Sequence, residues 1–111
     1  GLGIIDTVDN SVWRVRQPVK TKHSHSLDGE LFIGDGSDQL PAILAWRRQG
    51  EALDGPYLVC RHGGGWSEQR RHVHPRIAPD GRSVLFTSDQ GGFPRVYSVA
   101  LPESIASLPR V

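Results

Sequence analysis

The sequence predicts an all-β chain that forms about two four-stranded blades of a β-propeller. Short alternations of apolar and polar residues recur along the chain, and turn residues separate them at spacings of roughly ten residues. A weak internal repeat of about 50 residues fills nearly the whole length. Because two blades cannot close a ring that normally needs four or more, we expect the chain to be a fragment of a longer propeller.

The first half of the chain contains four expected strands. Residues 11–16 (SVWRVR) alternate apolar and polar side chains, as a half-buried strand does. The turn pair Asp28-Gly29 leads into the second strand, and a polar turn over 50–55 precedes the fourth. The four strands are expected at 11–16, 30–34, 42–47 and 57–61.

The second half begins where Gly63-Gly64-Gly65 interrupts the pattern and predicts a loop to about Arg71. Turn sequences then separate three further strands, expected at 74–77, 83–87 and 95–101. Pro102 can occupy the first turn of a short turn or helix over 102–108.

The repeat divides the partial propeller, 1–111, into blade-like units at about 10–62 and 72–101. An HSH triplet at 23–25 and an HVH triplet at 72–74 each precede an Asp-Gly turn and a strand. A repeat of this length is typical of propeller blades. The alternative is a small, self-contained β-sandwich in which the repeated histidine triplets arise by chance.

Composition excludes several classes of protein. The chain has 111 residues, with 13 basic and 12 acidic side chains and a net charge of +1, which predicts no nucleic-acid partner. No apolar run is long enough to span a bilayer, and no signal segment opens the chain, so we expect no membrane association. The absence of methionine agrees with a fragment. The single cysteine, Cys60, is expected to be a buried, inert thiol.

The histidines predict a metal site. On a strand, His72 and His74 would point to the same face, and Gln69 precedes them on the loop. His23 and His25 form a second pair of the same spacing. Imidazole and carbonyl ligands without thiolate favour Mn²⁺, with Zn²⁺ or Ni²⁺ as alternatives. The competing interpretation is that these are hydrogen-bonded or surface histidines.

Three other side chains are weaker candidates for substrate binding. Arg70 and Arg71 could hold carboxylates, and Trp66 could stack on a sugar face. The alternative is that they are solvated loop residues. The sequence identifies no catalytic nucleophile or base.

The stretch from His72 to Leu101 resembles a TolB-type propeller blade, with an Ala-Pro-Asp-Gly turn, a strand ending in Thr-Ser-Asp, and a Val-Tyr strand. Further motifs look like the C-terminal part of the oligogalacturonate lyase family, a propeller-fold family of polysaccharide lyases that acts on short pectin fragments. These motifs are Gln69-x-x-His72-x-His74-Pro75, the HSHSLDG run at 23–29 leading into FIGDG at 32–36, and Cys60-Arg61-His62.

The resemblance implies a seven-bladed, cytoplasmic enzyme that uses Mn²⁺ or another divalent ion on an oligogalacturonate substrate. It implies metal ligands at Gln69, His72 and His74, and at His23 rather than His25. The family's base, an arginine, would lie in a preceding blade, outside this chain. The missing blades, or self-association, would cover the exposed sheet edges. The alternative function is a non-catalytic TolB-like binding or scaffold module.

Overall fold

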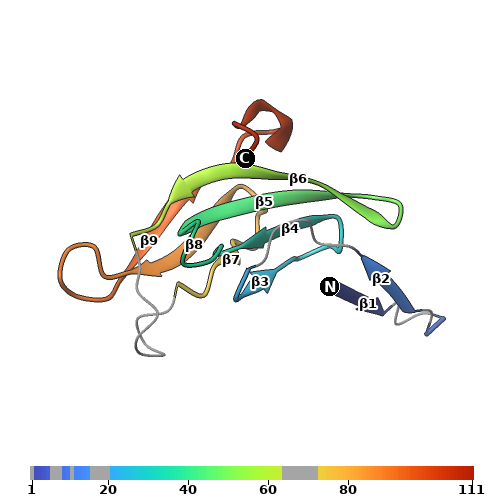
Figure 1. Cartoon of the computed structure of the whole chain (residues 1–111), viewed down its shortest axis with the longest axis horizontal. Helices are drawn as coiled ribbons and strands as arrows, with labels where there is room; N and C mark the ends of the chain where they lie inside the picture. The colour runs from blue at the N-terminus through green and yellow to red at the C-terminus, as the bar shows by residue number, and fades with distance from the viewer. Residues whose placement is uncertain (1, 6–8, 11, 16–20, 64–72) are drawn as a thin grey trace.

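The computed structural model describes residues 2–5, 9–10, 12–15, 21–63 and 73–111 (Figure 1). The described residues form antiparallel strands and one short 3-10 helix, so the predicted all-β class is confirmed. The elements are β1 (Leu2–Ile5), β2 (Val12–Val15), β3 (Ser24–His25), β4 (Leu31–Gly34), β5 (Ala42–Gln49), β6 (Ala52–Arg61), β7 (Arg76–Ile77), β8 (Ser83–Ser88), β9 (Arg95–Ala100) and η2 (Ile105–Ser107).

The larger sheet has four strands in the order β3-β4-β5-β6. Its central strand, β5, is buried on both faces over residues 42–46, which explains the continuous apolar run. Ile43 points toward the smaller sheet, whereas Trp46 packs on the opposite face with Phe32 and Leu53. The polar turn predicted over 50–55 is therefore too long, because β6 already begins at Ala52 and Leu53 is buried.

The smaller sheet has three strands in the order β7-β8-β9, and it lies at the left end of the larger sheet in Figure 1. Val84 and Phe86 alternate along β8 and are both buried. They form one hydrophobic core with Ile33 and Ile43 of the larger sheet. The interface between the two sheets is therefore apolar, as expected of neighbouring blades.

The structure differs from the predicted units in two places. β2 pairs with β1 in a separate two-stranded sheet rather than with the larger sheet, whose fourth strand is instead the two-residue β3. The second sheet has three strands in the described part of the chain, at the three positions expected for the second half, although β7 begins two residues later than expected. Strand β3 is too short to produce a hydrophobic period, so the sequence pattern could not reveal it.

The predicted helix over 102–108 is shorter than expected. Ser104 caps the 3-10 helix Ile105–Ser107, and Ile105 is buried in the core. Pro102 precedes the helix and is not part of it. The described residues contain no helix long and apolar enough to cross a membrane.

The last residues of the chain cover part of the outer edge of β6 (Figure 1). The Leu58 N–H donates to the Pro109 carbonyl at 2.7 Å, and the Val111 N–H donates to the Pro56 carbonyl at 3.0 Å. The Arg110 guanidinium pairs with Asp54 and holds the pKa of that carboxyl below its ordinary value. This segment satisfies backbone groups that an open edge would leave unpaired.

Candidate metal centre

Four of the five histidines lie among the described residues: His23, His25, His62 and His74. The other predicted ligands, Gln69 and His72, lie outside the described residues, as do the substrate-binding candidates Trp66, Arg70 and Arg71.

His23 immediately precedes β3. The Asp35 N–H donates to the His23 carbonyl at 3.2 Å, and the Lys22 N–H donates to the Gly36 carbonyl at 3.2 Å. His23 and Asp35 therefore lie opposite each other, on the segment that leads into β3 and the segment that follows β4. Nδ1 of His23 lies 2.6 Å from Oδ2 of Asp35, whose side chain is fully buried.

This contact determines which nitrogen of the ring carries the proton. A carboxylate accepts and does not donate, so Nδ1 of His23 donates to it. In the neutral ring the lone pair is then on Nε2. Histidines that bind metals almost always donate their other ring N–H to a carboxylate, a backbone carbonyl or water, and the His23–Asp35 contact is of the first kind.

His74 lies beside His23. Their ring centroids are 4.3 Å apart, with the ring planes at 48°. The flanking residues Val73 and Pro75 are buried, whereas His74 is exposed and has a left-handed φ of 42°. The Thr87 N–H donates to the Val73 carbonyl at 2.8 Å and fixes this segment against β8.

The backbone of His74 corrects the geometry that the sequence predicts. The argument that residues two apart share a face requires a strand, and β7 begins only at Arg76. Left-handed backbone is uncommon for residues other than glycine and is found most often in turns and functional sites.

His25 makes a different hydrogen bond from that of His23. Its Nδ1 accepts a hydrogen bond from the Ile77 N–H at 3.0 Å, which joins β3 to β7. In a neutral ring the proton is therefore on Nε2, and neither nitrogen has a lone pair to give to a metal ion. Burial, together with the nearby Arg76, lowers the pKa of His25. The second HxH pair thus does not converge on one ligand.

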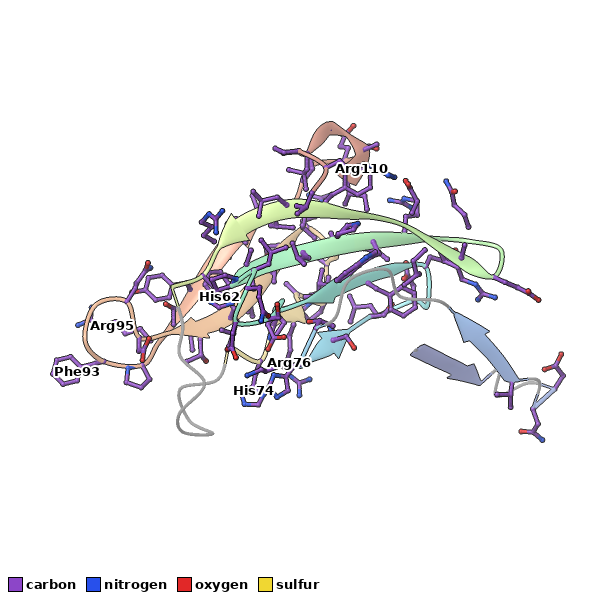
Figure 2. All side chains as sticks on the ribbon, in the orientation of Figure 1. His62, His74, Arg76, Phe93, Arg95 and Arg110 are labelled. Carbon is purple, nitrogen blue, oxygen red and sulfur yellow. The ribbon has the colours of Figure 1, made fainter. Side chains whose placement is uncertain are left out.

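A small pocket opens where the two sheets meet. It has a volume of about 140 Å³ and is lined by His23, Ser24, His25, His74, Pro75 and Arg76. Figure 2 shows His74 and Arg76 close together on this side of the molecule. Within the described ranges, no three His, Cys, Asp or Glu side chains gather closely enough to hold a metal ion.

His62 follows β6 and is fully buried. Its Nε2 donates to the Asp35 carbonyl at 2.9 Å, and the Ser88 hydroxyl donates to the His62 carbonyl. His62 therefore links the chain after β4 to β8 in the smaller sheet. Burial raises the pKa of the Cys60 thiol, as expected for an inert side chain.

The burial of His62 predicts a loss of stability in acid. Desolvation lowers its pKa, although the hydrogen bond to Asp35 opposes the shift. Near pH 6.5, the ordinary pKa of a histidine, the unfolded chain therefore binds more protons than the folded chain. The free energy of unfolding should consequently fall as the pH falls through that value. Urea unfolding between about pH 5 and about pH 8 measures this. A His62→Gln variant should lose part of the pH dependence, and an unchanged slope would contradict the assignment.

The sequence does not mark two residues of this site as functional. Asp35 falls within the FIGDG run, and Arg76 within an expected strand. No sequence signal reports that Asp35 lies across from His23, because the pairing depends on how β3 and β4 align.

No family model matches the chain. The oligogalacturonide lyase of Pectobacterium atrosepticum is 30% identical to it over 116 aligned positions, which cover 89% of this chain and 29% of the relative. A solved oligogalacturonate lyase in complex with manganese superposes with a TM-score of 0.75 and 28% identity, covering 95% of this chain and 29% of that one. The chain corresponds to a segment of the oligogalacturonate lyase family.

The TolB-like repeat is also supported. The Tol-Pal system protein TolB of Bordetella pertussis is 40% identical over 52 residues, which cover 40% of this chain and 11% of TolB. The match to the lyases is longer, and it includes the segment that holds His23 and His74, because it spans most of the chain. The chain spans less than a third of the length of these lyases.

Proposed function

We propose that this chain supplies the metal-binding part of an oligogalacturonate lyase, which breaks its substrate by β-elimination. The observation that carries the proposal is the Asp35–His23 pair, which directs the lone pair of an imidazole to Nε2 beside a second imidazole in one pocket. The family match and the manganese held by the solved lyase support it.

The residues of the pocket fit a divalent ion. His23 and His74 would bind it, with His72 and Gln69 completing the donor set predicted from the sequence. This set has nitrogen and oxygen donors and no thiolate, which suits Mn²⁺. When bound, the ion would offset the negative charge that develops on a uronate as its C5 proton leaves.

The chain's own residues orient the substrate in this proposal. Arg76 lines the pocket and is exposed, so its guanidinium can pair with a uronate carboxylate. Asp35 holds the His23 ring in place. The base that removes the C5 proton comes from outside this chain.

Substitution of His74 tests the proposal in an enzyme that contains this segment. His74→Ala and His72→Ala should each reduce metal-dependent formation of the unsaturated uronate product at least about 100-fold, because a bound metal ion contributes several kcal/mol to transition-state stabilisation. Arg82→Ala, an exposed change away from the pocket, should leave the rate unchanged. Full activity in both histidine variants would exclude the proposed site, and absence of lyase activity in the unmodified enzyme would favour a scaffold module.

A further inference from the structure

Asp35 is a carboxylate with no exposed surface, in a position just after β4. Burying a charged carboxylate is unfavourable unless hydrogen bonds replace the lost water. Three donor groups lie at one of its oxygens, Oδ1: the Lys22 N–H at 3.0 Å, the His23 N–H at 2.9 Å, and the Thr21 hydroxyl at 2.9 Å, whose single proton is also within reach of the His23 carbonyl. The other oxygen, Oδ2, faces Nδ1 of His23 at 2.6 Å.

The two oxygens of Asp35 therefore have different surroundings. The donors at Oδ1 fix the rotation of the carboxylate, since two of them are backbone N–H groups that cannot turn away. The main chain of Asp35 is fixed as well, because its carbonyl accepts from the buried His62. Oδ2 is consequently held against the imidazole as a rigid acceptor.

We propose that Asp35 is a positioning residue that selects the Nδ1–H tautomer of His23 and so makes Nε2 the metal-binding nitrogen. The inference rests on the proposed function for the role of the metal ion. The choice of tautomer follows from the hydrogen bonds alone.

The substitution Asp35→Asn tests this role, because it keeps the shape of the side chain and changes the group that faces Nδ1 of His23. Asparagine has nearly the same shape, but one of its two terminal groups is a donor. The two backbone donors at Oδ1 require the amide oxygen there, so the NH₂ group must take the place of Oδ2. It would then donate to Nδ1 of His23, move the ring proton to Nε2 and remove the lone pair from that nitrogen.

Long-range ¹H–¹⁵N NMR spectra of the metal-free 111-residue chain at about pH 8, where histidine is neutral, report the tautomer directly. We expect Nδ1–H for His23 in the unmodified chain and Nε2–H in Asp35→Asn. The affinity for Mn²⁺, measured by calorimetry on the same samples, should fall at least about 10-fold in the variant. The matched control is Asp28→Asn, whose carboxylate accepts the N–H groups of Glu30 and Leu31 through one oxygen and can keep both bonds as an amide.

Each outcome decides the inference. An Nε2–H tautomer in the unmodified chain, or Nδ1–H in a folded Asp35→Asn, would overturn it. A changed tautomer with unchanged Mn²⁺ affinity would overturn the role in metal binding. If Asp35→Asn does not fold, the tautomer of the unmodified chain decides alone. If the unmodified chain has the expected tautomer but binds no Mn²⁺, the proposed function fails while tautomer selection by Asp35 stands.

Discussion

A His23→Asn variant of the chain should bind Mn²⁺ at least about 100-fold more weakly than the unmodified chain. Losing a residue that only hydrogen-bonds a metal ligand typically lowers metal affinity about 10- to 100-fold, and losing the ligand itself should lower it more. Asparagine reaches only as far as Nδ1 of a histidine. Its amide can therefore still donate to Asp35 and keep the hydrogen bond now made at 2.6 Å. What the substitution removes is Nε2, so a loss of affinity reports the ligand rather than a loss of folding. Calorimetric titration with Mn²⁺ measures the effect.

His25→Asn is the matched control for this prediction. Here the amide oxygen takes the place of Nδ1 and can accept the Ile77 N–H, now bonded at 3.0 Å. The second histidine of the HSH triplet then loses the same atoms as the first but should keep the affinity of the unmodified chain. Equal losses in both variants, or a loss only in His25→Asn, would show that the ligand is wrongly assigned.

Trp46→Ala should lower the free energy of unfolding by about 3–5 kcal/mol. Trp46 has no exposed surface and packs with Phe32 and Leu53 on one face of the larger sheet. Gly55 lies close to the indole ring, since a Cβ there would lie 3.0 Å from Cδ1, so removing the ring also removes its contact with this backbone. The loss is a large part of the roughly 5–15 kcal/mol that stabilises a typical domain. Urea unfolding followed by circular dichroism measures it.

The neighbouring position on β5 provides the control. Arg47 is exposed, and Arg47→Ala should change the stability by no more than about 0.5 kcal/mol. Trp46→Phe should fall between the two, because it keeps an aromatic ring and removes an indole N–H that has no hydrogen-bond partner in the described structure. A Trp46→Ala variant as stable as Arg47→Ala would mean that this face of the sheet is not a core.

The strands that could be predicted are those whose side chains alternate or form an apolar run. β4, β5, β8 and β9 begin within a residue of their expected positions, because burial leaves a period that can be read from the sequence. β3 and the pairing of β2 with β1 could not be predicted. β3 has two residues and is defined by its alignment with Ile33 and Gly34, which only the folded sheet specifies.

The site was predicted in its residue types and not in its geometry. The HxH triplets and their spacing indicated imidazoles near each other, and His23 and His74 do lie together. Strand alternation does not describe His74, which has a left-handed backbone before the start of β7, and the Nδ1 atom of His25 accepts from the Ile77 N–H. The sequence left the choice between His23 and His25 to a family resemblance, whereas the two hydrogen bonds at Nδ1 give a physical basis for it.

The central claim is that this segment holds a divalent metal ion between His23 and His74. The most direct test is the ¹H–¹⁵N NMR spectrum of the chain during titration with Mn²⁺, whose unpaired electrons broaden the signals of nearby nuclei. We predict that broadening begins at residues 22–25 and 73–76 while the signals of the β8–β9 turn and of η2 stay sharp. Broadening that begins at other residues, or none at Mn²⁺ concentrations well above that of the protein, would show that the metal ion does not bind between His23 and His74.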